Sequence, residues 1–204
     1  MAPPLIAVID HGAGNLVSIG RGLQRAGADV RIASHPDELE GADGVVLPGV
    51  GATATVMAGI RSAGFETALR EWTLPLLGIC VGMQVLFDRS SEDGARGLGL
   101  IAGRVEPLAD APHLPHIGWN ELSTVPDPLF DGLPPRPEVY FVHSFAPVPT
   151  SSDVVIARAT HGGEFVAAVR HGNTIGTQFH PERSGEAGLS ILDNFVTATV
   201  RAPA

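Results

Sequence analysis

Apolar and polar residues alternate in blocks along the first ninety positions, in a pattern typical of strands followed by helices. Four mainly apolar segments predict strands, at 5–9, 30–33, 44–48 and 74–79. The run at 5–9 is continuously apolar, which suits a strand that is covered on both faces. Apolar residues at helical spacing predict the segments between them as helices, at 15–26, 52–72 (broken near Gly64) and 81–88. Strands that alternate with helices pair in parallel, so we expect an α/β fold with a doubly wound, mostly parallel sheet.

The second half of the chain has a different pattern. Ten of the 17 prolines lie between Pro107 and Pro149, and they exclude long helices from that stretch. Large apolar side chains are interleaved with these prolines and favour burial, so we expect ordered loops and short antiparallel strands rather than a linker. Further strands are expected at 154–158, 165–170 and 174–179, and a closing helix at 188–200. Without a repeat or a linker, residues 1–204 are predicted to form a single domain.

Composition excludes several classes of function. Hydrophobic residues make up 44% of the 204 residues and charged residues 17%, which favours a packed core over disorder. A net charge of −9 argues against a nucleic acid or an anionic membrane as partner. The chain contains no Lys, which excludes a Schiff-base lysine, a Walker A lysine and a Ser–Lys dyad. No targeting segment or membrane-length apolar run is evident, so a cytoplasmic setting is expected.

The single cysteine lies where a predicted strand becomes a predicted helix, within Gly78-Ile79-Cys80-Val81-Gly82. Small residues two before and two after a nucleophile are typical of a tight strand–turn–helix elbow, in which a Cβ at either glycine would crowd the strand or the helix. A helix that begins at Val81 favours a thiolate at Cys80 and aims the Val81 N–H at an oxyanion. The alternative, a small buried hydrophobic cysteine, does not explain the flanking glycines.

Two further segments complete this candidate site. Pro48-Gly49-Val50-Gly51 follows a predicted strand, and its glycines allow a second backbone N–H to turn toward a ligand, although an ordinary turn would look the same. His180 and Glu182 are two residues apart in an extended segment and face the same way. Glu182 can therefore orient one nitrogen of the His180 ring while the other faces Cys80, as in a catalytic triad, although a surface His beside a surface Glu is common.

Two other motifs are weaker. The segment at 10–15 contains glycines after a strand but lacks the third glycine and the acidic residue of a dinucleotide-binding loop. His113 and His116 are too close together and too constrained by proline to form a helical pair of metal ligands. We therefore expect no cofactor and no metal.

Together these segments resemble a known family. Gly78-Ile-Cys-Val-Gly-Met-Gln84 and Gln178-Phe-His-Pro-Glu182 resemble the class I (triad) glutamine amidotransferases, whose sheet is flavodoxin-like. The chain more narrowly resembles the glutaminase subunits of imidazole glycerol-phosphate synthases, through four further segments in order: Asp10–Asn15, Pro48–Gly51, Pro115–Asn120 and Tyr140–Ser144. This resemblance spans nearly the whole chain.

The resemblance implies a reaction and a set of site residues. Cys80 is expected to attack the side-chain amide of L-glutamine, with His180 as base and Glu182 orienting it, and water then hydrolyses the thioester. The oxyanion hole is expected to consist of backbone N–H groups of Val50 and Val81. The residues expected around the bound glutamine are Gly49, Gly51, Gln84, Glu92, His143, Ser144 and Phe145.

The resemblance also implies a partner, a cyclase subunit with a (β/α)8 barrel. Ammonia would cross the interface and react with a ribonucleotide in histidine biosynthesis, giving imidazole glycerol phosphate and an aminoimidazole carboxamide ribotide. A closed path suits ammonia, because free ammonia would be protonated and lost in water. Residues at positions that match the interface are Asn15, Trp119, Asn120, Tyr140 and Arg183, and core packing is the alternative explanation for Trp119 and Tyr140.

Three alternatives remain open at this point. An ammonia-donating subunit for anthranilate, aminodeoxychorismate or pyridoxal phosphate synthesis would share the triad but fits the segment 116–120 less well. A stand-alone cysteine hydrolase of the same fold would act without a partner. A binding module that has lost activity is the third, and the intact set of Cys80, His180 and Glu182 argues against it.

Overall fold

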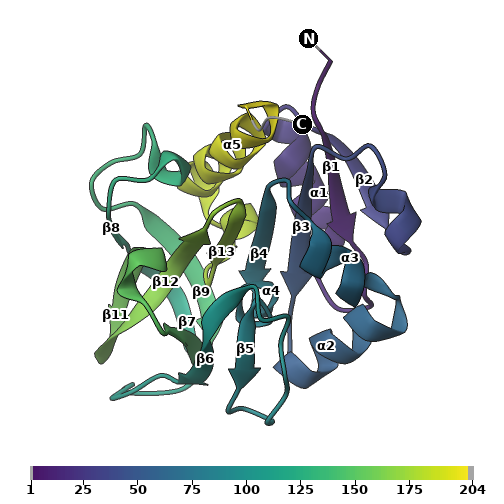
Figure 1. Cartoon of the computed structure of the whole chain (residues 1–204). Helices are drawn as coiled ribbons and strands as arrows, with labels where there is room; N and C mark the ends of the chain where they lie inside the picture. The colour runs from purple at the N-terminus through teal and green to yellow at the C-terminus, as the bar shows by residue number, and fades with distance from the viewer. Residues whose placement is uncertain (1, 202–204) are drawn as a thin grey trace.

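The computed structural model describes residues 2–201, and within them a single large sheet positions the site. Its strand order is β2-β1-β3-β4-β13-β12-β11-β8, with β2 to β13 parallel and the last three strands antiparallel (Figure 1). The strands in that order are Asp29–Ala33, Leu5–Ile9, Gly44–Gly49, Leu76–Cys80, Thr174–Thr177, Gly163–His171, Val155–His161 and Ser123–Thr124. The prediction of a doubly wound, mostly parallel sheet with added antiparallel strands is confirmed.

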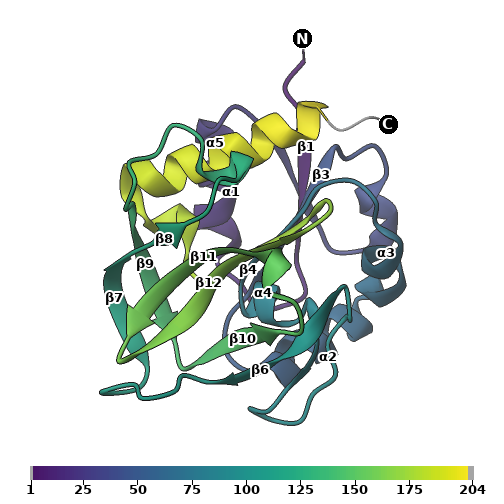
Figure 2. The ribbon, with the colours of Figure 1, turned by 60° about the vertical axis from the view of Figure 1, so that its left-hand side comes forward.

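Helices cover both faces of this sheet. Helices α1 (Leu16–Arg25) and α5 (Gly185–Arg201) lie on one face, and α2 (Thr53–Ser62) and α3 (Phe65–Glu71) lie on the other (Figures 1 and 2). Every residue of β3 and β4 is buried, as expected for strands covered on both sides. Gly64 separates α2 from α3 with a φ of 80°, a left-handed conformation that glycine adopts at little cost, so the predicted break is present.

The predicted helix at 81–88 is wrong in its second half. Helix α4 spans only Val81–Gln84, and the chain continues into strand β5 (Phe87–Ser90). Strand β5 pairs with β6 (Ile101–Pro107), which pairs with β10 (Phe145–Pro149) in a separate three-stranded sheet. The N–H of Leu98 donates to the carbonyl of Val85 at 2.7 Å, and the N–H of Leu100 donates to that of Leu86 at 2.8 Å. These long-range bonds take the carbonyls that a longer helix would need.

The proline-rich stretch is ordered, as predicted. Strands β7 (His116–Glu121) and β9 (Glu138–His143) form an antiparallel pair, and the 3-10 turn Pro128–Phe130 follows β8. The carboxylate of Asp127 accepts two hydrogen bonds of 2.7 Å from Arg170, which fixes that turn against β12. The remaining 3-10 turns are Pro36–Leu39, Ser152–Val154 and Pro181–Arg183.

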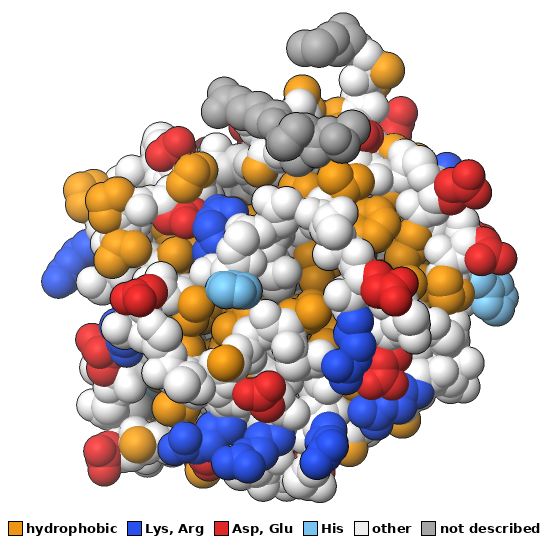
Figure 3. Space-filling model, viewed as in Figure 1, with side chains coloured by type: hydrophobic (Ala, Val, Ile, Leu, Met, Phe, Trp, Pro, Cys, Tyr) orange, Lys and Arg blue, Asp and Glu red, His pale blue; other side chains and the backbone are white. Residues whose placement is uncertain are grey.

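On the surface viewed in Figure 3, acidic and basic side chains are interspersed, with several basic ones gathered along the lower edge.

None of the helices within residues 2–201 is long and apolar enough to cross a bilayer. The part of the chain that the structure describes also holds no group of three His, Cys, Asp or Glu side chains arranged for a metal ion.

Candidate active site

The candidate site lies at the carboxyl ends of four neighbouring parallel strands. Asn15 follows β1, Gly49–Gly51 end and follow β3, Cys80 ends β4, and His180 and Glu182 follow β13. Because carboxyl ends of parallel strands meet at one edge of a sheet, the topology brings these distant segments together. A cavity of about 300 Å³ opens there, lined by Asn15, Val50, Gly51, Cys80, Val81, Gln84, Glu92, Pro115, Val142, His143, Ser144, Phe145, His180, Glu182 and Arg183.

Cys80 occupies a strained turn that only its glycine neighbours allow. Its φ of 57° lies in the left-handed region, which is uncommon for a residue with a side chain. A Cβ on Gly82 would lie 1.9 Å from the carbonyl oxygen of Leu47, and one on Gly78 would lie 2.6 Å from that of Gly82. The crowding predicted at both glycines is therefore present, and the turn places Cys80 in the wall of the cavity at the start of α4.

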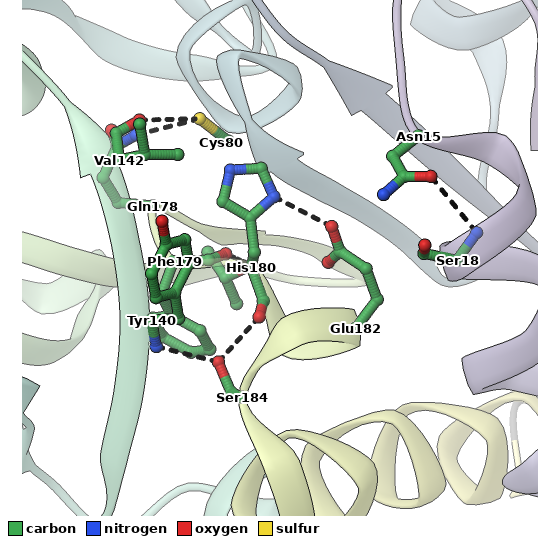
Figure 4. Close-up of polar contacts among 11 residues, drawn as sticks. Asn15, Ser18, Cys80, Tyr140, Val142, Gln178, Phe179, His180, Glu182 and Ser184 are labelled. Carbon is green, nitrogen blue, oxygen red and sulfur yellow. Dashed lines mark hydrogen bonds and ion pairs between the residues drawn. The ribbon is translucent and has the colours of Figure 1, made fainter. Parts of the chain in front are cut away.

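His180 and Glu182 form a buried pair directed at this turn, although the prediction of a shared extended segment is wrong, because Glu182 lies in the 3-10 turn Pro181–Arg183. The His180 Nδ1 lies 2.9 Å from Glu182 Oε1, and the carboxylate side chain is 0% exposed. The other ring nitrogen, Nε2, is buried without a hydrogen-bond partner and lies on the side of the ring toward Cys80 (Figure 4). Burial lowers the pKa of His180, but the attraction of Cys80 and Glu182 outweighs it and raises this pKa to about 10.

The sulfur of Cys80 is held by two other groups in this structure. Its Sγ lies 3.9 Å from the carbonyl oxygen of Val142, to which the thiol donates, and 3.6 Å from the amide nitrogen of Gln178, from which it accepts (Figure 4). Gln178 was not among the predicted site residues. The signal was available, because Gln178 is two positions before His180 in the same extended segment and so faces the same way.

The two residues predicted to form the oxyanion hole both line the cavity. Strands β3 and β4 pair with Gly49 opposite Cys80, so Val50 and Val81 follow side by side. A Cβ on Gly49 would lie 2.5 Å from the Gly82 nitrogen, which explains why glycine is needed there although Gly49 does not line the cavity. A residue from another segment also holds this turn in place, because His11 Nε2 donates a hydrogen bond of 2.7 Å to the backbone carbonyl of Pro48.

Of the residues predicted to surround glutamine, Gly51, Gln84, Glu92, His143, Ser144 and Phe145 line the cavity. Some of their polar atoms already have partners in the chain. Glu92 Oε2 accepts from the N–H of Thr53 at 3.2 Å, at the start of α2. His143 uses both ring nitrogens, on the carbonyl of Phe145 at 2.9 Å and on the His116 ring at 3.1 Å. The pKa of His143 is lowered to about 4, mainly because the ring is buried, so the ring is neutral near pH 7. Its role is therefore to support the cavity wall.

Four of the five predicted interface residues lie near the mouth of the cavity or on one face beside it. Asn15 and Arg183 line the cavity, and the Arg183 guanidinium lies over the Tyr140 ring, 5.1 Å from its centroid. The Tyr140 ring meets that of Trp119 edge to face at 6.2 Å, and Trp119 is 55% exposed, so it is not a core residue.

Asn120 lies on the opposite face of β7 from Trp119. Its amide donates to the carbonyl of Thr160 at 2.8 Å, toward β11. Successive residues of a strand point to opposite faces, so two neighbours in sequence cannot both present their side chains to one partner from a regular strand. The side chains of Asn120 and Trp119 therefore lie on opposite faces of β7, and the place of Asn120 at an interface stays a prediction.

Comparison with known proteins fits this geometry. The model of the family "Glutamine amidotransferase class-I" matches residues 7–199. The chain therefore belongs to the class I glutamine amidotransferase family. PurLQS from Thermotoga maritima has the same fold, with a TM-score of 0.74 at 21% identity over 96% of this chain and 98% of that one.

Curated relatives indicate which group of class I glutamine amidotransferases the chain belongs to. A protein of Synechococcus sp. (strain JA-3-3Ab), named imidazole glycerol phosphate synthase subunit HisH, is 48% identical, covering 96% of this chain and 94% of the relative. A protein of the same name from Moorella thermoacetica is 44% identical over 93% of both chains. Within the amidotransferases, the chain belongs to the family of these subunits.

Proposed function

We propose that this chain is the glutaminase subunit of an imidazole glycerol-phosphate synthase, hydrolysing L-glutamine to glutamate and ammonia. The observation that carries the proposal is the buried His180–Glu182 pair, whose free ring nitrogen is directed toward a cysteine on a strained turn. A cavity of about 300 Å³ at this point is at the small end of the ~300–1,000 Å³ typical of ligand sites, as suits an amino acid. In this proposal, residues 1–204 form a single glutaminase domain.

The reaction uses Cys80 as a thiolate beside a protonated His180, whose raised pKa keeps a proton on Nε2 near pH 7. The sulfur then attacks the side-chain carbonyl carbon of glutamine, and the N–H groups of Val50 and Val81 receive the oxyanion. Collapse of the tetrahedral intermediate breaks the C–N bond, and His180 returns the proton to the leaving ammonia. Water, deprotonated by His180, hydrolyses the thioester to glutamate and restores the thiolate. Glu182 keeps Nδ1 protonated and fixes the ring throughout.

The cavity walls position the rest of the substrate. A carboxylate such as Glu92 suits the α-ammonium group of glutamine, and its Oε2 is already anchored to α2 through Thr53. Gln84, Ser144 and Phe145 lie around the side chain, and Gly49 and Gly51 let the oxyanion segment approach it. His143 acts from behind by holding the Phe145 carbonyl.

The ammonia passes to a cyclase subunit with a (β/α)8 barrel, which makes imidazole glycerol phosphate and aminoimidazole carboxamide ribotide. We assign the docking surface to Asn15, Trp119, Tyr140 and Arg183, because an exposed Trp beside a Tyr–Arg stack is the composition of an interface hot spot. Asn120 supports this surface from the inner side of β7. A cytoplasmic setting suits the mechanism, because oxidising compartments convert free thiols to disulfides.

The test is reconstitution with a candidate cyclase subunit and its ribonucleotide substrate. Cys80→Ser is expected to abolish glutamine-dependent synthesis while ammonia-dependent synthesis by the same complex survives, since the acceptor chemistry belongs to the partner. The isolated wild-type chain is expected to release glutamate slowly until cyclase and ribonucleotide are present. If one oxyanion donor is misplaced in the isolated chain, its rate should be lower than that of the complex by a factor of about 10²–10³. Equal loss of both syntheses in Cys80→Ser, or full activity of the lone chain, would contradict the proposal.

A further inference from the structure

The amide of Gln178 touches the reacting sulfur, although Gln178 is outside the triad. Its side chain is fully buried, with 0% exposure, and its Nε2 lies 3.6 Å from Cys80 Sγ. Its Oε1 lies 3.0 Å from Nε2 of Gln84, another buried amide. A buried side-chain amide beside the nucleophile can either donate to the sulfur or accept from it, and the two orientations have opposite effects on a thiolate.

The orientation of this amide follows from a backbone carbonyl. Gln84 lies 3.0 Å from the carbonyl oxygen of Phe145, and a carbonyl can only accept, so the Gln84 atom there is its NH₂ group. The same NH₂ group faces Gln178, so the Gln178 atom that faces Gln84 is the oxygen. The other end of the Gln178 amide, directed at Cys80 Sγ, is therefore its NH₂ group. Phe145 thus determines, through Gln84, that the sulfur receives an N–H.

The loss of the thiol proton changes the balance of contacts around the sulfur. A thiol donates to the carbonyl of Val142 at 3.9 Å, but a thiolate cannot, and it is repelled by that oxygen. The contact with Gln178 behaves in the opposite way, because an N–H donor binds an anion more strongly than a neutral acceptor. Deprotonation therefore loosens the sulfur from Val142, while Gln178 and the protonated His180 retain it.

We propose that Gln178 is a further catalytic residue, which donates an amide hydrogen bond to the Cys80 thiolate, and that Gln84 is the positioning residue that keeps the amide in this orientation. The inference deepens the proposed function and rests on Cys80 being the nucleophile. Gln178 stabilises the ionised sulfur before glutamine is attacked, and it contacts the nucleophile rather than the substrate.

The single cysteine allows a direct test on the complete chain, because iodoacetamide alkylation reports on Cys80 alone. Gln178→Glu replaces the donor by a carboxylate of the same shape, and Gln178→Met replaces it by an uncharged side chain of similar length. Alkylation at pH 7 is expected to slow about tenfold or more in Gln178→Glu, and less in Gln178→Met, since hydrogen bonds to charged groups are the stronger ones. The pH dependence of alkylation is expected to move toward higher pH in both.

Gln24→Glu is the matched control, because Gln24 is the exposed glutamine of α1 and the same change of charge there leaves the sulfur's contacts intact. Its alkylation rate and pH profile are expected to equal those of the wild type. In the reconstituted complex, both Gln178 variants are expected to lower kcat with little change in KM for glutamine. If Gln178→Glu does not fold, as judged by thermal unfolding, Gln178→Met decides the question. If neither folds, Gln84→Met decides it, because the released amide can rotate and alkylation should still slow.

Wild-type alkylation rates and pH profiles in the folded Gln178 variants would overturn the inference. That result leaves the proposed function intact if Cys80→Ser still abolishes glutamine hydrolysis. Conversely, a Cys80→Ser chain that still hydrolyses glutamine refutes the proposed function, whatever the Gln178 variants do.

Discussion

The backbone N–H of His180 donates a hydrogen bond of 3.0 Å to the backbone carbonyl of Tyr140. Ser184 reinforces this link, because its buried hydroxyl donates to the His180 carbonyl at 2.6 Å and accepts from the Tyr140 N–H at 2.9 Å (Figure 4). The proposed general base is therefore fixed to strand β9 at the residue whose ring belongs to the proposed docking surface.

Removing the Ser184 hydroxyl tests this link. Ser184→Ala leaves a buried N–H and a buried carbonyl each short of one partner, which is expected to cost about 1–3 kcal/mol in the free energy of unfolding. Glutaminase activity is expected to fall as well, because the His180 backbone is held less firmly. Urea unfolding and glutamate release measure the two effects. The exposed Ser62→Ala is the control and should change neither; unaltered activity in a clearly destabilised Ser184→Ala would show that the contact is structural only.

The pH dependence of stability tests the electrostatics of the triad. Because the pKa of His180 in the folded chain is about 10, above the ordinary 6.5, its protonated form stabilises the fold. That contribution is complete below pH 6.5 and is lost as the pH rises toward 10. Glu182→Gln removes one of the two groups that raise this pKa, so the variant should be less stable near pH 6.5 and approach the wild type near pH 10.

Denaturant unfolding of both chains at several pH values between 6.5 and 10 checks this prediction. A stability difference that is constant over this window, or that widens toward pH 10, would mean that Glu182 does not act through the charge on His180.

The elbow glycines give a contrast between two Gly→Ala changes. Gly82→Ala would place a methyl group 1.9 Å from the Leu47 carbonyl oxygen, and neither backbone can move without separating β3 from β4. A loss of more than about 3 kcal/mol, or failure to fold, is expected. Gly20→Ala meets only Val30, at 3.7 Å, inside helix α1, and should be neutral or stabilising by up to about 1 kcal/mol. Thermal unfolding of the two variants checks the contrast, which would fail if Gly82→Ala melted with the wild type.

Substitution of Trp119 is expected to weaken binding of the partner subunit without destabilising the chain. Trp119 is 55% exposed, so Trp119→Ala should change the free energy of unfolding by less than about 1 kcal/mol. Loss of a hot-spot Trp is nevertheless expected to weaken binding of the cyclase subunit by about 2 kcal/mol or more. Val200→Ala, at the far end of α5, truncates a 51% exposed residue away from the site and serves as control. Titration calorimetry with the cyclase decides, and equal affinities of the two variants would place the interface elsewhere.

Local constraints explain which parts of the molecule could be predicted. The buried strands, the break at Gly64 and the glycine elbow at Cys80 each depend on a few adjacent residues, and their backbone requirements can be recognised in the sequence. Strand β5 could not be predicted in this way, because Phe87–Ser90 forms a strand only through its pairing with residues 101–105. Local spacing after Cys80 favours helix, and the long-range hydrogen bonds overrule it.

The chemistry of the site divides in the same way. The sequence alone predicted the proposed nucleophile, base and orienting carboxylate, from two glycines around Cys80 and from the two-residue spacing between His180 and Glu182. Only the tertiary structure decided that Gln178 donates to the sulfur and that His143 uses both ring nitrogens in hydrogen bonds within the cavity wall. These features depend on contacts between residues far apart in the chain, and packing fixes such contacts where spacing cannot.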